Sequence, residues 1–136
     1  MMQEKKIFQQ LTSKNLLEIY TSKLVGNKEV SFPPPFDAEG KLESIVATAT
    51  GSLFGSENYP KPEYKTVAYL YFIIKDHPFV DGNKRIAVYA LTVLADINSL
   101  HLRKVNLAEL AVFVEKYSAT NHHEFIKRIA DIIFES

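Results

Sequence analysis

Two apolar stretches joined by a short polar connection constrain the fold more than any other feature of the sequence. The first is the eight-residue run Val67–Ile74. The second, Ile86–Ala95, contains one polar residue, Thr92, when Tyr89 is counted with the aromatics. Both stretches are too apolar for the one-sided stripe of a surface helix, so they predict helices covered on most sides. We expect the first helix to begin near Pro62 and the second to span residues 84–98.

Further helices are expected on either side of this central pair. Thr12 is a suitable N-cap for a helix in which apolar residues recur every three or four positions. Gly26-Asn27 is expected to end that helix in a left-handed conformation. Asparagine followed three residues later by glutamate predicts two more helix starts near the C-terminus. The three expected helices span residues 13–25, 107–117 and 122–134.

The segment between the first helix and the central pair is expected to be less regular. Residues 27–40 contain three consecutive prolines and predict a loop, with Phe32 and Phe36 as its anchors. A short helix is expected at 42–46. The small and polar residues from Val46 to Phe54 then predict a hairpin or flap. The fold class is therefore all-α, with about five helices and one flap in a single domain of residues 1–136.

Charge and composition exclude several classes of function. Sixteen basic and sixteen acidic side chains give a net charge of zero, and the 136 residues include no cysteine. This balance lacks the basic footprint of nucleic-acid binding, and no apolar run approaches the ~20 residues of a membrane span, so neither partner is expected. Disulfides and thiolate metal sites are excluded. The first ten residues lack the apolar region of a signal peptide, which favours the cytoplasm.

Polar chemistry is concentrated in the connection between the two apolar helices, which reads HPFVDGNKR over residues 77–85. His77 is a candidate general base, and Asp81 is a hard oxygen ligand suited to Mg²⁺. Lys84 and Arg85 can neutralise phosphoryl oxygens at the start of a helix, whose free amides also attract anions. Gly82 allows a close approach of the backbone. Together these groups suit transfer of a phosphate ester.

Each of these residues also has an ordinary structural interpretation. His77 alone is more often a loop or capping residue, Asp81 a helix cap, and Lys84-Arg85 a solvated first turn. The last interpretation is unfavourable, because cations at a helix N-terminus oppose the macrodipole unless an anion is bound. The combination therefore favours a functional site.

The string HPFVDGNKR resembles the signature of the Fic/Doc family, and it is most similar to the Doc-like (death-on-curing) form. The resemblance extends over roughly residues 11–100, although only the nine-residue motif is specific. It implies that His77 activates a hydroxyl of a target protein and that Asp81 holds Mg²⁺ on the phosphates of ATP. It also implies an anion hole formed by Gly82, Asn83, Lys84 and Arg85.

The resemblance further implies that the flap aligns a segment of the target protein as an added strand. The flap residues expected to dock the target are Thr48, Ala49, Thr50 and Gly51. Main-chain pairing would explain why their side chains are small.

Two departures from the family pattern bear on the reaction and its control. Fic adenylyltransferases carry a glycine and a further arginine where this chain has Lys84 and Val88. Doc-like members share the lysine, so phosphate transfer is favoured and AMP transfer is the alternative. The self-inhibitory Fic pattern has one imperfect match, Thr120–Phe125, in which capping is the better interpretation of Glu124. If the activity is inhibited in the cell, the inhibitor is expected to be a separate antitoxin-like partner. A non-catalytic binding module remains a third alternative.

Overall fold

The two apolar stretches form the centre of the fold. In the computed structural model, which describes residues 7–118 and 120–135, they lie in helices α3 (Pro62–Asp76) and α4 (Asn83–Ile97). Nine of the fifteen residues of α3 are buried. This helix contacts α2, α4, α5 and α6, which accounts for its lack of a polar face. The two predicted central helices are confirmed, although α4 is less covered than expected, with seven of its fifteen residues buried.

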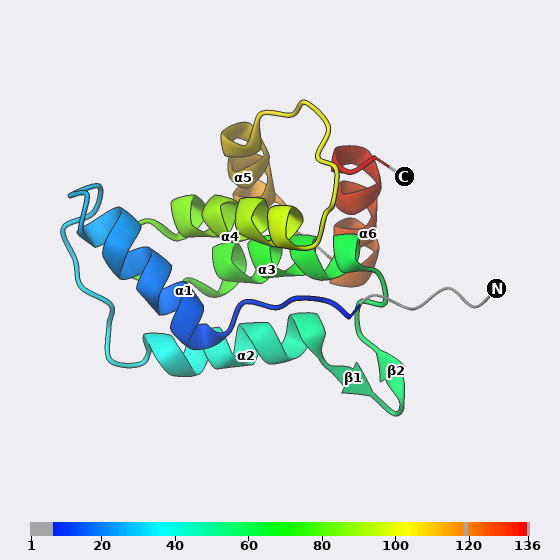
Figure 1. The fold of residues 1–136 in the computed structure, drawn as a ribbon, viewed down its shortest axis with the longest axis horizontal. Coiled ribbons are helices and arrows are strands. Elements are labelled where there is room, and N and C mark those ends of the chain that lie inside the picture. Colours follow the sequence, from blue (N-terminus) through cyan, green and yellow to red (C-terminus); the bar gives the residue numbers. More distant parts are fainter. Residues whose placement is uncertain (1–6, 119, 136) are drawn as a thin grey trace.

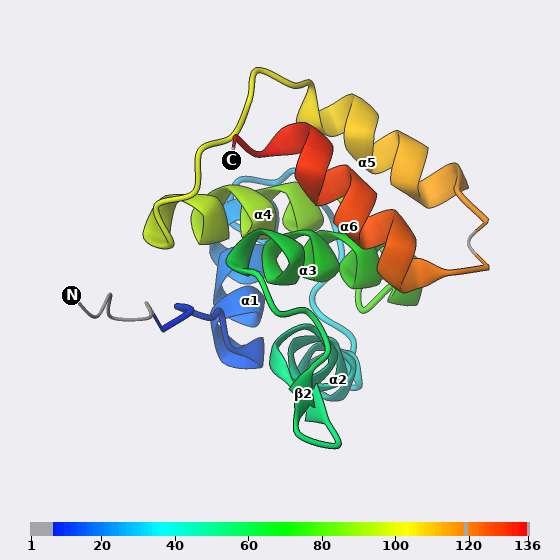
Figure 2. The same ribbon diagram turned by 90° about the vertical axis from the view of Figure 1, so that its right-hand side faces the viewer.

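The remaining helices cover the pair from two sides (Figures 1 and 2). Helix α1 (Ser13–Ile19) and helix α2 (Ala38–Thr50) lie on one side, and α5 (Leu107–Lys116) and α6 (His122–Ile133) lie on the other. The described residues thus contain six α-helices and one small antiparallel hairpin, so the predicted all-α class with a β-hairpin is confirmed. None of the described helices combines the length and the apolarity that crossing a membrane requires.

The predicted helix starts near the C-terminus are also confirmed. The Asn106 side-chain oxygen accepts a hydrogen bond from the Glu109 amide at 3.0 Å, and Asn121 does the same for Glu124 at 3.1 Å. These bonds satisfy amides that have no partner within the helix. Helices α5 and α6 therefore begin where the sequence predicts and end within one residue of the expected position.

The predicted helix 13–25 is present, but its end differs from the prediction. Its second half, Tyr20–Val25, is a π-helix, and Gly26 still donates to the Thr21 carbonyl at 2.8 Å. Gly26 therefore stays right-handed (φ −62°), and the left-handed residue is Lys28 (φ 57°). The left-handed turn therefore lies two residues later than Gly26, after the wider turn of the π-helix. No local sequence pattern indicated this π-helix.

The predicted boundaries of α2 and of the flap are wrong. Helix α2 covers the end of the expected loop, the expected short helix and most of the expected flap. Thr48 and Thr50 were expected in the flap, yet their hydroxyls donate to the carbonyls four residues earlier, at 2.9 and 2.7 Å. The helix has a buried face along its whole length, formed by Ala38, Leu42, Ile45 and Ala49. Because these buried positions recur at helical spacing, the whole segment packs as a helix, whatever its local preference for a strand.

The hairpin follows α2 and projects from the end of the helical body (Figure 1). Strands β1 (Ser52–Leu53) and β2 (Ser56–Glu57) pair antiparallel. At the turn, Phe54 has a left-handed backbone (φ 52°) and is 97% exposed. A bulky residue in that region is a strained exception, and such exceptions concentrate at functional sites.

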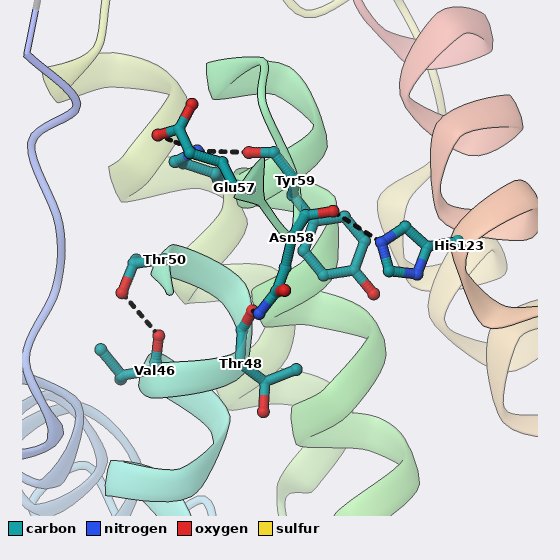
Figure 3. A network of polar contacts seen from close by, with 8 residues as sticks. Val46, Thr48, Thr50, Glu57, Asn58, Tyr59 and His123 are labelled. Atoms are coloured by element: carbon teal, nitrogen blue, oxygen red, sulfur yellow. Dashed lines mark hydrogen bonds and ion pairs between the residues drawn. The ribbon is translucent and has the colours of Figure 1, made fainter. Parts of the chain in front are cut away.

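The base of the hairpin is fastened to its surroundings by polar contacts (Figure 3). The Asn58 amide donates to the Gly51 carbonyl at 2.9 Å, and the Asn58 side chain donates to Thr48 at 3.1 Å. Nε2 of His123, on α6, lies 2.6 Å from the Asn58 carbonyl, and the ring stacks on Tyr59. The hairpin therefore has a fixed base and an exposed tip.

The expected anchors of the predicted loop 27–40 are also wrong. Phe36 is fully exposed and Phe32 is about half exposed, whereas Val30 is buried. The amides of Val30 and Glu29 both donate to the Leu24 carbonyl in the π-helix, at 3.3 and 2.8 Å. These bonds fix the start of the loop and the position of Val30.

Candidate active site

His77 lies at the C-terminal end of α3, where the chain leaves the helix. Its backbone is left-handed (φ 48°, ψ 64°), so it caps the helix and changes the direction of the chain. The side chain is exposed, while the next two residues, Pro78 and Phe79, are buried. A non-glycine residue in this conformation is uncommon, and here it presents the imidazole to solvent at the mouth of the central helix pair.

Phe79 fixes the loop that follows His77 to the core. Its ring is 3% exposed and stacks on Tyr20, with ring centroids 3.8 Å apart and planes 4° from parallel. The Tyr20 hydroxyl lies 3.2 Å from the Asp81 carbonyl and 3.0 Å from that of Phe32. Burial, followed by the negative charge of Asp81, raises the pKa of Tyr20. Tyr20 stays a neutral hydrogen-bond donor that ties the loop to the π-helix.

Asn83 closes the loop from the inside. Its side-chain oxygen accepts from the Phe79 amide at 3.0 Å, and its nitrogen donates to the Phe79 carbonyl at 2.8 Å. The same nitrogen lies 3.5 Å from Nδ1 of His77. The buried carboxamide is thus used to hold the loop and orient His77. Its backbone amide, in the first turn of α4, is the group it can offer to an anion.

Gly82 precedes α4 and has a backbone conformation that is unfavourable for residues with a side chain. Its backbone is left-handed (φ 84°), and a Cβ built on it would lie 2.9 Å from Cγ1 of Val30. We therefore expect Gly82→Ala to lower the free energy of unfolding by about 1–3 kcal/mol. The measurement is urea denaturation followed by circular dichroism.

Gly40→Ala is the matched control for this substitution. Gly40 lies within α2, and a Cβ there would have no atom within 4 Å. Alanine should stabilise the helix at this position by about 0.5–1 kcal/mol. Equal effects of the two substitutions would contradict the steric role of Gly82.

The motif residues converge on one cavity of about 210 Å³. His77, Asp81 and the four residues of the expected anion hole all line it. The full lining is His77, Val80, Asp81, Gly82, Asn83, Lys84, Arg85 and Glu115. The cavity is small and open to solvent, and it is lined by an imidazole, two carboxylates and two cations beside the N-terminus of α4.

Both cations of the motif have partners within the protein. Lys84 Nζ donates to Oε2 of Glu115 at 2.8 Å, and Arg85 donates to the Glu29 carbonyl at 2.8 Å. Sequence reasoning missed Glu115, which lies 31 residues after Lys84 on α5. Its position in an amphipathic helix resembles that of any solvent-facing glutamate, so no local signal identifies it.

Comparison with known proteins agrees with this geometry. The model of the Fic/DOC family matches residues 3–95, which is more than half of the chain. The chain belongs to the Fic/DOC family. It is also 35% identical over 63 residues to the protein named Toxin Doc of Mycolicibacterium smegmatis (strain ATCC 700084 / mc(2)155). That match covers 46% of this chain and 48% of the relative, about half the length of each.

Two carboxylates near the histidine of this Fic/DOC protein differ in electrostatic environment. The hydrogen bond from Lys84 lowers the pKa of Glu115, which stays charged. Burial raises the pKa of Asp76, although the charges of His122, Lys41 and His77 act in the opposite direction. Asp76 directly precedes His77 but does not line the cavity.

Asp81 is the residue of the Fic/DOC motif best placed to hold a metal ion. It is exposed at the cavity, and one of its oxygens accepts from the Gly82 amide at 2.8 Å, which orients the carboxylate. Within residues 7–118 and 120–135, no cluster of three histidine or acidic side chains could hold a metal ion. A single carboxylate fits Mg²⁺, which retains several waters and binds phosphates alongside one or two carboxylates.

The flap residues of the Fic/DOC protein are not part of the cavity. Thr48, Ala49 and Thr50 form the last turn of α2, and the Ala49 side chain is buried. Their backbone is helical and not extended, and their amides lie within α2, so they do not form the strand that the flap was expected to present. Gly51 lies at the junction with β1, and the strands of the hairpin are Ser52–Leu53 and Ser56–Glu57.

Proposed function

We propose that the chain is a Doc-like toxin that transfers a phosphate from ATP to a hydroxyl side chain of a target protein. The observation that carries this proposal is the shared cavity of His77, Asp81 and the N-terminus of α4. Fic/DOC membership and the similarity to the protein named Toxin Doc support a protein-modifying transferase. ATP, Mg²⁺, the target protein and the cytoplasm as the place of action belong to the proposal.

In the proposed reaction, His77 takes the proton from the target hydroxyl as the oxygen attacks the γ-phosphorus of ATP. The new oxygen–phosphorus bond forms as the bond to the β-phosphate oxygen breaks, leaving ADP, and His77 later gives its proton to water. The first-turn amides of α4, with Lys84 and Arg85, hold the phosphoryl oxygens in place. Mg²⁺ held by Asp81 would neutralise phosphate charge. Asn83 keeps the imidazole oriented from 3.5 Å.

The environment of Val88 favours phosphate transfer over AMP transfer. Fic adenylyltransferases have an arginine at this position, whereas Val88 lines an apolar cavity of about 420 Å³ between α4 and α5. Residue 88 therefore offers no charge to a second phosphate group. Lys84 and Arg85 line both this cavity and the one around His77, whereas His77, Asp81 and the start of α4 lie at the latter.

The hairpin supports docking of a protein target. Two short strands with exposed residues present free backbone groups at their edges, and an extended peptide can pair with such an edge. At the tip, Leu53 is 63% exposed and Phe54 is 97% exposed. Apolar side chains on a projecting hairpin are suited to contact with another protein.

Mass spectrometry of the modified target tests the proposed reaction. A cell extract incubated with the protein, ATP and Mg²⁺ should yield a target peptide heavier by ~80 Da, because a phosphoryl group replaces the hydroxyl proton. An increment of ~329 Da would instead show AMP transfer, the alternative reaction. A chain that binds ATP but modifies nothing in extracts of several bacteria would support the non-catalytic module.

We also propose that a separate antitoxin partner restrains the activity. The support is the relative named Toxin Doc, together with the place of Glu124. That glutamate pairs with Arg128 at 3.3 Å on α6 and lines a cavity different from the one that contains His77. An internal glutamate from the Thr120–Phe125 segment therefore does not reach the motif.

A further inference from the structure

The cavity proposed to take phosphate contains a carboxylate that the family motif does not supply. Glu115 Oε2 accepts a hydrogen bond from Lys84 Nζ at 2.8 Å, and both side chains line the cavity with His77 and Asp81. Lys84 is 41% exposed and Glu115 is 38% exposed, so an incoming ligand can reach both. A phosphate group entering this cavity therefore meets a charge of its own sign.

The framework of the protein determines where Glu115 lies. Lys75, in the last turn of α3, donates to the backbone carbonyls of Glu115, at 3.2 Å, and of Tyr117. Lys75 is only two residues before His77. Lys75 thus ties the end of α5 to the end of α3, just before His77. This contact holds the Glu115 backbone beside the cavity.

Helix electrostatics explain why an anion is favoured at this position. Lys84 is the second residue of α4, where a cation opposes the helix macrodipole and where an anion stabilises the helix start. Arg85 donates to a neutral carbonyl, that of Glu29. Among the described residues, Glu115 is the acidic side chain paired with a cation of the motif.

We propose that Glu115 is an internal anion that occupies Lys84 when the phosphate site is empty and gives it up when a nucleotide binds. This inference rests on the proposed function, because it requires that the cavity take the phosphates of ATP. Every ligand must exchange the Glu115–Lys84 pair for its own contact with Lys84. Glu115 thereby weakens binding and favours ligands with several negative charges over those with one.

Isothermal titration of the full chain with ATP and Mg²⁺ tests the inference directly. Glu115→Gln removes the charge and keeps the size of the side chain. We expect it to bind ATP about two- to fivefold more tightly than the wild type, the factor that an exposed ion pair contributes to an equilibrium. The matched control is Glu124→Gln, which removes the same charge from the Glu124–Arg128 pair away from the cavity. It should leave the affinity unchanged.

A double-mutant cycle separates the ion pair from a general change in charge. In a Lys84→Met background, Glu115→Gln should no longer tighten binding, because there is no cation to release. Unchanged or weaker binding by Glu115→Gln, with Lys84 intact, would overturn the inference. An equal gain in the Lys84→Met background would also overturn it. If no folded variant binds ATP, the proposed function itself fails.

Discussion

Replacement of His77 by alanine should lower the rate of target modification by about 10²–10⁴-fold, the contribution of a positioned general base to proton transfer. His77 is exposed at the cavity, and its ring is oriented by Asn83. The measurement is transfer of labelled γ-phosphate from ATP to proteins of a cell extract. Growth of cells that express the variant gives a second readout, because a Doc-like toxin that has lost its base should no longer inhibit growth.

His77→Asn separates the imidazole from the backbone that carries it. Asparagine accepts the left-handed conformation of residue 77 more readily than most residues, so the turn out of α3 should be kept. Both variants should bind ATP with the affinity of the wild type, since the cations and the α4 amides are intact. His101→Ala, at an exposed histidine outside the cavity, is the control. Modification that persists without His77 would contradict the catalytic assignment.

The fold was predictable from the sequence where burial alone decides the structure. The apolar runs of α3 and α4 leave no alternative to covered helices, and side-chain caps mark the starts of α5 and α6. Only residues 42–46 of helix α2 were predicted, because the small and polar residues that follow favour a flap locally, while the buried face of the helix depends on packing against α3. The π-helix before Gly26 likewise has no signature in the local sequence.

The candidate site was predictable where its residues are neighbours in the sequence. Because the nine-residue motif comprises the connection 77–82 and the first three residues of α4, His77, Asp81 and the α4 N-terminus must lie near one another. The residues that support them come from elsewhere in the chain. Tyr20 stacks on Phe79 across 59 positions, and Glu115 reaches Lys84 from α5. Such contacts depend on how the helices pack, which periodicity does not specify.

The second large effect is expected at Phe79, whose substitution by alanine should lower the free energy of unfolding by about 3–5 kcal/mol. The ring is buried, and its removal leaves a cavity against Tyr20 while ending a parallel stack at 3.8 Å. Because small domains are stable by only about 5–15 kcal/mol, this change should shift urea denaturation markedly. A double-mutant cycle with Tyr20→Ala would measure the stacking interaction itself.

Phe36→Ala distinguishes loss of this anchor from loss of aromatic surface in general. The substitution deletes the same atoms from a fully exposed ring in the loop before α2. It should change the free energy of unfolding by no more than about 0.5 kcal/mol. Phe79→Leu should recover part of the stability, because an apolar side chain again fills the site. The hydrogen bonds to the Asn83 side chain come from the backbone amide and carbonyl of residue 79, so leucine keeps them as well. Denaturation curves that coincide for Phe79→Ala and Phe36→Ala would show that the His77 loop does not depend on its contact with the core.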